Sequence, residues 1–223
     1  MSPRARSTTT TTTVTSTAGT TRDHILLAAT HVFHTLGAAR ATTKEIAQAA
    51  GLSEAALYRH FADKSELFLC VIGDHLARLI AALHDLPNRV GRRTVRANLE
   101  DIAEVALPFY DETAPMAAAL LAEPDLLARH RADMASKGAG GPQRSMEALA
   151  EYLRAEQRAG RVSPRADPAA AASLLLGACL LRAYLGRFKG QPHDPAADAR
   201  FVKAVVRTLV CGLDAERIPP DPS

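Results

Sequence analysis

The chain has 223 residues, of which 47% are hydrophobic and 23% are charged. A chain of this length and apolar content can bury its own core, so disulfide bonds are not required for folding. Its formal net charge of +3 is too small to indicate nucleic-acid binding by itself, because many soluble enzymes are as basic.

Residues 1–21 are predicted to form a disordered N-terminal arm, because Ser and Thr dominate them and offer little to bury. Arg4 and Arg6 could follow a phosphate backbone, but a solvated tail is the simpler interpretation. From residue 22 onward apolar side chains recur every three or four positions up to Leu36, which predicts a helix over 22–36.

Three further helices are predicted in quick succession. A short helix over 43–50 is broken by Gly51, and Ser53 can cap a third helix that ends near residue 60. Asp63 and the glutamate three residues later have the spacing of a capping box, which predicts the start of a longer helix. That helix is expected to run through residue 83 and to be closed by Pro87 and Gly91.

The remainder of the chain also has helical patterns. Helices are expected over about 94–110 and after Pro115 and Pro124, since proline is tolerated in a first turn. A glycine-rich loop is expected at 137–142, followed by an amphipathic helix that ends at residue 160. The two most apolar helices are expected at 168–188 and 195–213, before a loose proline-rich tail at 214–223. No segment alternates in the manner of a strand, so the predicted fold class is all-α.

The segment 42–64 has the pattern of a helix-turn-helix. Its two short helices must cross closely, which favours a small residue such as Ala47, and its turn favours a residue that tolerates positive φ, such as Gly51. Leu57 and Phe61 lie one turn apart and can face inward together with Leu52. The opposite face of the third helix is then free to meet DNA.

The residues on that face have side chains suited to a duplex. Arg59 can neutralise a phosphate or pair with guanine, and hydroxyl and basic side chains nearby can bind phosphate oxygens. Glu54 repels phosphate, although it could accept a hydrogen bond from a cytosine amino group. The predicted DNA-binding residues are Thr42, Thr43, Lys44, Ser53, Glu54, Ala55, Ala56, Tyr58, Arg59, His60 and Lys64.

Residues 22–70 resemble the DNA-binding domain of the TetR family of transcriptional regulators. The resemblance rests on A-A-x-x-V-F before Gly37, on T-T-K-E-I-A and A-G-L-S, and on L-Y-R-H-F-x-D-K-x-E-L-F. Leu36, Ala38 and the Glu54-Ala55-Ala56 start of the recognition helix depart from the usual pattern. The resemblance implies a helix-turn-helix domain at 22–67 and a helical effector-binding and dimerisation domain at 68–213.

The resemblance also implies an effector pocket and a homodimer. Adaptable methionine and aromatic side chains suit the walls of a pocket for an apolar or amphipathic effector, although each could simply pack in the core. The expected pocket residues are Phe109, Tyr110, Met116, Leu120, Met134, Met146 and Tyr152. The last two helices are apolar around most of their circumference, which predicts a four-helix dimer interface formed by Leu174, Leu175, Leu181, Phe201, Val205, Val206 and Leu209.

Other chemistry is weakly represented. His31 and His34 lie one turn apart but have no third ligand, so no metal site is predicted. The acidic residues Asp101, Glu104, Asp111 and Glu112 are interpreted as the wet side of a helix. The cysteines, Cys70, Cys179 and Cys211, show no paired spacing and are flanked by apolar residues, which predicts buried free thiols in a reducing compartment.

We therefore predict a cytoplasmic transcriptional repressor that needs no cofactor. It is expected to bind a palindromic operator in double-stranded DNA as a homodimer and to be released by a small-molecule effector. No membrane association is expected, because the longest apolar stretch, Ala169 to Leu181, falls short of the roughly 20 residues that span a bilayer. The alternative is a helical small-molecule-binding protein or enzyme without DNA binding. Activation cannot be separated from repression by sequence.

Overall fold

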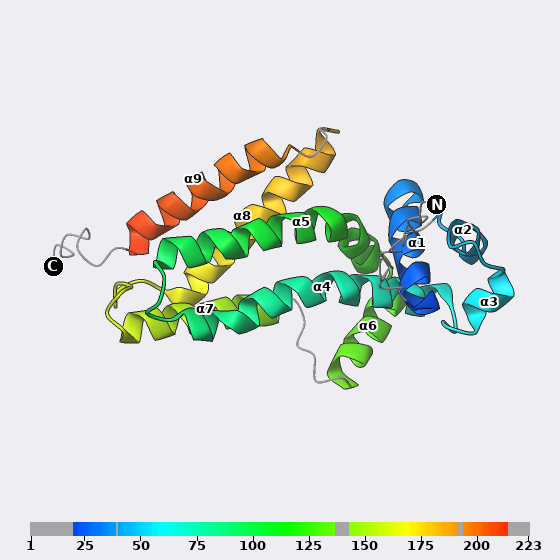
Figure 1. The fold of residues 1–223 in the computed structure, drawn as a ribbon, viewed down its shortest axis with the longest axis horizontal. Helices are drawn as coiled ribbons and strands as arrows, with labels where there is room; N and C mark the ends of the chain where they lie inside the picture. Colours follow the sequence, from blue (N-terminus) through cyan, green and yellow to red (C-terminus); the bar gives the residue numbers. More distant parts are fainter. Residues whose placement is uncertain (1–19, 39, 137–142, 191–193, 214–223) are drawn as a thin grey trace, which may run out of the picture.

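The computed structural model describes residues 20–38, 40–136, 143–190 and 194–213. All regular structure in these residues is helical, which confirms the all-α prediction. Figure 1 shows α1, α2 and α3 at one end of an elongated molecule, with the longer helices extending away from them. The helices of this part of the chain are α1 (Thr21–Leu36), α2 (Thr43–Ala49), α3 (Glu54–Tyr58), α4 (Lys64–Arg89), α5 (Val95–Ala122), α6 (Pro124–Ser136), α7 (Gln143–Arg158), α8 (Pro168–Phe188) and α9 (Pro195–Leu213).

The predicted disordered arm, 1–21, is wrong at its last two residues, because Thr20 caps α1 and Thr21 begins it; the rest of the arm lies outside the described residues. The predicted glycine-rich loop at 137–142 and loose tail at 214–223 also lie outside them. The predicted helices over 22–36, 168–188 and 195–213 agree with the observed bounds to within one residue.

The first two helices begin at caps that the local sequence supplies. The Thr20 hydroxyl accepts a hydrogen bond from the Asp23 backbone N–H, and the Asp23 carboxylate accepts one from the Thr20 N–H at 2.7 Å. Thr42 and Glu45 form the same reciprocal pair at the start of α2. These pairs satisfy N–H groups that a helix start otherwise leaves without partners.

The start of α4 differs from the predicted capping box. The Asp63 carboxylate accepts from the Glu66 N–H at 2.7 Å, as expected. The Glu66 carboxylate, however, accepts from the N–H of Ala62 at 2.6 Å, one residue before the cap. Two N–H groups are still satisfied, so the helix starts where the spacing predicts.

Two predicted boundaries at prolines are wrong. α4 continues through Pro87 to Arg89, and α5 runs unbroken through Pro108 and Pro115 instead of starting anew at Pro115. Proline removes one helical hydrogen bond and crowds the carbonyl four residues earlier, but a helix held by tertiary packing can continue with a kink. Helix α6 does begin at a proline, Pro124, as predicted.

The buried apolar side chains form two separate cores. The first lies at the α1–α3 end and includes Phe33, Leu57 and Phe68. The second joins α4, α5, α7, α8 and α9. Helix α5 contributes to both, because Leu99 belongs to the second core and Met116 to the first. The two long helices α4 and α5 therefore connect the small N-terminal unit to the larger bundle.

By length and composition alone, α4 and α8 could each cross a membrane. A helix in the interior of a soluble protein passes the same test. Leu67, Val71 and Leu79 are fully buried along α4, and Leu175, Leu176 and Cys179 are buried along α8. Both helices therefore bury one apolar face inside this protein.

Candidate nucleic-acid interface

The turn between α2 and α3 has the geometry that the helix-turn-helix pattern predicts. Gly51 has φ of 70°, in the left-handed region that favours glycine. Ala47 is 1% exposed at the crossing of the helices. The Ser53 hydroxyl then accepts a hydrogen bond from the Ala56 N–H and starts α3. The five-residue helix is thus aligned by the turn before it.

Two buried side chains and one arginine hold α3 in place. Leu57 and Phe61 are 0% and 1% exposed in the first core. The guanidinium of Arg22, at the start of α1, lies 4.3 Å from the centre of the Phe61 ring, and its Nη1 donates to the His60 carbonyl at 3.0 Å. A cation over an aromatic face is attracted to the ring, so Arg22 ties α1 to the residues that follow α3.

The opposite face of α3 is open to solvent. Ala55, Tyr58 and Arg59 are exposed, as are Thr42 and Lys44 at the start of α2. In the described part of the chain, neither the Arg59 guanidinium nor the Lys44 ammonium group makes a hydrogen bond or ion pair with another residue. Their charges are therefore available to a phosphate backbone.

Glu54, the acidic residue on this face, is held by α2. The Thr43 hydroxyl donates to its carboxylate at 2.5 Å. Because that hydroxyl has only one hydrogen, the contact of 3.2 Å between the Thr43 and Tyr58 oxygens requires Tyr58 to donate. The three residues form one chain of hydrogen bonds that turns the carboxylate toward α2 and fixes the Tyr58 ring.

The remaining predicted DNA-binding residues are partly committed to the fold. The hydroxyls of Thr42 and Ser53 act as helix caps, and Ala56 and His60 are half-buried. Lys64 lies in the first turn of α4. The hydrogen bond from the Thr42 side chain holds the pKa of the Glu45 carboxyl below its usual value, with a smaller contribution from the charge of Lys64. Sequence reasoning missed Arg22, because its partners lie 38 or more positions away.

Two family models match this chain. The model described as "Bacterial regulatory proteins, tetR family" matches residues 25–71, the segment that contains α2 and α3. The model described as "AefR-like transcriptional repressor, C-terminal domain" matches residues 116–212. Together they cover more than half of the chain, in the order that the resemblance implies. The chain belongs to the TetR family.

Curated transcriptional regulators match part of this chain. The transcriptional activator FasR of Mycolicibacterium smegmatis is 34% identical over 90 residues, which are 40% of this chain and 39% of FasR. The transcriptional repressor BepR of Brucella suis is 42% identical over 76 residues, which are 32% of this chain and 36% of BepR. The matches thus span about two fifths of these relatives. This TetR-family chain is a transcriptional regulator with a DNA-binding helix-turn-helix, and it is not an enzyme.

Solved structures share this fold over most of the chain. A TetR-family regulator from Mesorhizobium loti has a TM-score of 0.66 and 22% identity, and the match covers 86% of this chain and 96% of that one. The fatty acid degradation regulator FadR of Bacillus halodurans has a TM-score of 0.65 and 19% identity, with coverage of 90% and 98%. At these identities the likeness shows a common fold.

The predicted dimer residues of this TetR-family chain fall into two groups. Leu174 and Leu181 are 65% and 56% exposed on α8, and Phe201, Val205 and Leu209 on α9 are half-buried. Leu175 and Val206 are 0% exposed, so their side chains belong to the monomer's own core and cannot meet a partner. The prediction for these two residues is corrected accordingly.

Two exposed aromatic residues on α8 were missed. Tyr184 and Phe188 are 55% and 76% exposed, and their rings stack with centroids 6.1 Å apart. They continue the row of Leu174 and Leu181 at helical spacing, a signal that was readable in the sequence. A surface hollow of about 580 Å³ lies between α8 and α9 beside Leu174.

The predicted effector residues do not line one cavity. Met116 and Leu120 are buried in the first core, with the helix-turn-helix, whereas Tyr152 is 2% exposed in the second. Asn98 Nδ2 donates to the Tyr152 hydroxyl at 2.8 Å, and burial raises the pKa of that hydroxyl above its usual value. The other predicted residues are Phe109, Tyr110 and Met146, packed beside the second core, and Met134, which lines a separate cavity of about 680 Å³ between α1, α4 and α6.

Proposed function

We propose that this protein is a cytoplasmic, dimeric repressor. Its helix-turn-helix domain, 22–67, binds a palindromic operator. Its helical domain, 68–213, forms the dimer and binds a small apolar or amphipathic effector. The observation that carries the proposal is the open face of α3. Ala55, Tyr58 and Arg59 are exposed there, while Leu57 on the opposite side is fully buried. A short helix anchored in this way can enter a major groove without losing its own packing.

The dimer proposal rests on the unburied apolar row of α8. Leu174, Leu181, Tyr184 and Phe188 are exposed apolar side chains on one helix, and exposed apolar side chains that lie together often mark a protein–protein interface. Pairing with the same face of a second copy, together with α9, would bury them in a two-fold interface. The two α3 helices of such a dimer would enter successive major grooves about 34 Å apart.

Repression is supported by the match of residues 116–212 to the C-terminal domain of AefR-like repressors and by the repressor BepR among the relatives. FasR is named as an activator, so activation is the second candidate. In vitro transcription from a promoter that carries the selected operator separates the two. If the protein is a repressor, adding it should reduce the amount of transcript. An increase in transcript would establish activation.

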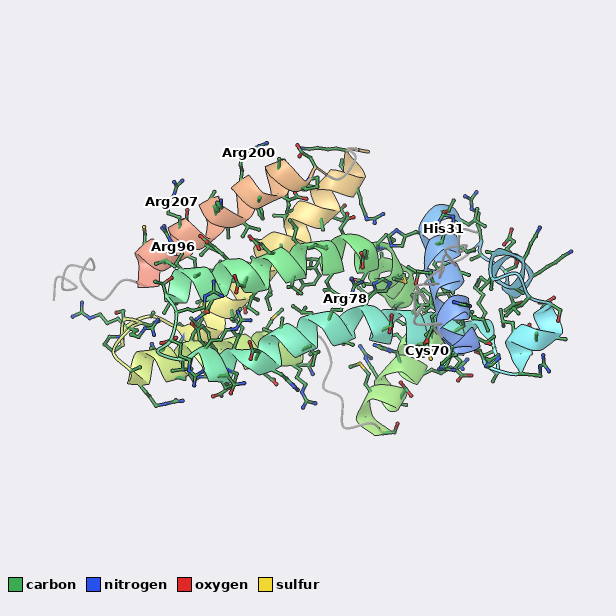
Figure 2. The ribbon with its side chains drawn as sticks, in the orientation of Figure 1. His31, Cys70, Arg78, Arg96, Arg200 and Arg207 are labelled. Atoms are coloured by element: carbon green, nitrogen blue, oxygen red, sulfur yellow. The ribbon has the colours of Figure 1, made fainter. Side chains whose placement is uncertain are left out.

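The decisive experiment is selection of a binding site from random duplex DNA, followed by affinity measurements at several salt concentrations. Replacing Arg59 and Lys44 by alanine should weaken binding and reduce the slope of log affinity against log salt by about one per lost phosphate contact. Arg207 is an exposed arginine on α9, at the far end of the molecule (Figure 2), so Arg207→Ala is the matched control. If the double variant binds DNA as tightly as the wild type, α3 is not part of the DNA interface.

Light scattering tests the dimer. Leu181→Glu places a charge in the centre of the exposed row and should yield monomers. Leu121 on α5 is 70% exposed but lies outside that row, so Leu121→Glu should leave the dimer intact. A wild-type monomer at micromolar concentration would contradict the proposed interface.

A further inference from the structure

The turn of α5 that precedes Pro115 contains a backbone carbonyl without its helical donor. Proline has no N–H, so it cannot give the carbonyl four residues earlier, that of Asp111, the usual hydrogen bond. Buried or half-buried carbonyls normally have a partner from elsewhere. In this protein the partner comes from another helix.

Arg187 of α8 supplies that partner. Its Nε donates to the Asp111 carbonyl at 2.7 Å, and the same nitrogen lies 3.3 Å from the Asp111 carboxylate. Arg187 is on the last turn of α8, next to Phe188, at the end of the exposed apolar row. The helix that we assign to the dimer is thus tied directly to the turn of α5 that precedes Pro115.

The next carbonyl in the same turn, that of Glu112, is bound by the DNA-binding unit. His34 Nε2 on α1 lies 2.6 Å from it. Because a carbonyl can only accept, Nε2 carries the hydrogen, and in the neutral ring Nδ1 is then an acceptor. Nη2 of Arg187 lies 3.5 Å from that Nδ1. One imidazole therefore contacts both α5 and α8.

The Glu112 side chain connects a fourth helix, α4, to these contacts between α1, α5 and α8. Its carboxylate lies 2.7 Å from His75 Nδ1 and 3.0 Å from Arg78 Nη2, both on α4. His75 is only 7% exposed, and its Nε2 lies 3.5 Å from the Thr30 hydroxyl on α1. The residues interpreted from sequence as the wet side of a helix, Asp111 and Glu112, instead join α1, α4, α5 and α8.

We propose that this turn, Asp111 to Pro115, is the joint that couples the DNA-binding domain to the rest of the protein, and that His34 is the positioning residue that sets the angle of α1. The proposal rests on the proposed function. A hydrogen bond of this kind weakens steeply when its geometry changes, so a small shift of α5 or α8 breaks this contact and allows α1 to change its angle. An effector or partner that moves the bundle then changes how the recognition helix is presented.

The joint predicts that coupling runs in both directions. Binding at one end of a coupled system must change the other end by the same free energy. DNA bound at α3 should therefore slow amide hydrogen exchange in 109–122 of α5 and at the end of α8. This readout needs no knowledge of the effector, and the probe is the duplex selected from random DNA.

Two variants of similar size separate hydrogen bonding from packing. His34→Gln keeps a donor that can reach the Glu112 carbonyl, whereas His34→Met keeps the volume and removes the donor. We expect His34→Met to bind the duplex about fivefold more weakly or worse and to lose the DNA-dependent protection of α5. His34→Gln should stay close to wild type in both measurements. A purely packing role would favour Met over Gln.

The matched control is His31→Ala, since His31 is exposed on the same helix and points into solvent (Figure 2). Pro115→Ala is a second, independent perturbation, because its new N–H competes with Arg187 for the Asp111 carbonyl. It should also weaken DNA binding while light scattering still shows the wild-type mass. Wild-type affinity and protection in both His34→Met and Pro115→Ala would overturn the joint alone. A wild-type protein that selects no duplex would overturn the proposed function, and the joint with it.

Discussion

The turn of the helix-turn-helix offers the sharpest test of the structural reasoning. Gly51 has φ of 70°, and a Cβ added there would meet no other atom within 4 Å. Gly51→Ala therefore introduces no clash with a neighbour and changes only the local backbone energy. Any loss of stability reports directly on the left-handed conformation.

The magnitude follows from two opposing effects. A residue with a Cβ pays about 1–2 kcal/mol in the left-handed region. Replacing glycine by alanine also restricts the unfolded chain, which stabilises the fold by about 0.4–1 kcal/mol. The expected net loss is therefore about 1 kcal/mol in the free energy of unfolding.

Gly73 provides a matched control with the opposite sign. It lies inside α4, away from the left-handed region, and a Cβ added there also meets nothing within 4 Å. Alanine is favoured over glycine in a helix interior by about 0.8–1 kcal/mol, so Gly73→Ala should stabilise the protein. The same chemical change at the two positions should thus differ by about 2 kcal/mol.

The assay is urea unfolding followed by far-ultraviolet circular dichroism, at one fixed protein concentration because a dimer's stability depends on it. The midpoint should fall for Gly51→Ala and rise for Gly73→Ala, with unchanged slopes. Equal shifts of the urea midpoint for the two variants, or a midpoint for Gly51→Ala that is not below that of the wild type, would refute the assignment of a left-handed turn at Gly51.

Three further outcomes follow from buried or capping groups. Burial raises the pKa of the Cys179 thiol to about 12, so iodoacetamide at neutral pH should modify Cys179 only after unfolding. Cys211 is exposed, contrary to the sequence prediction of a buried thiol, and should react in the native protein, as mass spectrometry can show. Leu57→Ala should cost about 3–5 kcal/mol in urea unfolding, because the side chain is 0% exposed, and a cost below about 1 kcal/mol would contradict that burial. Asp63→Ala removes the cap of α4 and should cost about 1 kcal/mol at neutral pH. The hydrogen bond from the Glu66 N–H lowers the pKa of Asp63 from its usual 3.8, so the carboxylate stabilises above that value, and the difference between variant and wild type should shrink as the pH falls below it.

Most of the local structure could be predicted from the sequence. The cap at Ser53, the break at Gly51 and the starts of α8 and α9 depend on residues a few positions apart, and their hydrogen bonds form within one or two turns. The helix-turn-helix is such a local unit, which is why its inward residue Leu57 was assigned correctly.

The proline-containing helices could not be predicted in this way. Pro115 is compatible with a new helix in the sequence. In the structure α5 continues through it, and Met116 packs into the first core. The same packing decided that Met116 and Leu120 serve the N-terminal core and not a pocket in the bundle.

The sequence by itself determined which segments are helical, where most of them begin and which face of α3 is polar, because hydrogen bonds and apolar periodicity within a few residues settle those features. Only the tertiary structure decided which apolar residues of α8 and α9 are already buried, as Leu175 and Val206 are, and which face solvent. It also decided that Arg22 supports α3 and that His34 and Arg187 meet at the turn of α5 before Pro115. The physical reason is that these contacts join residues 38 to 153 positions apart, and no spacing along the chain specifies which distant helices pack together.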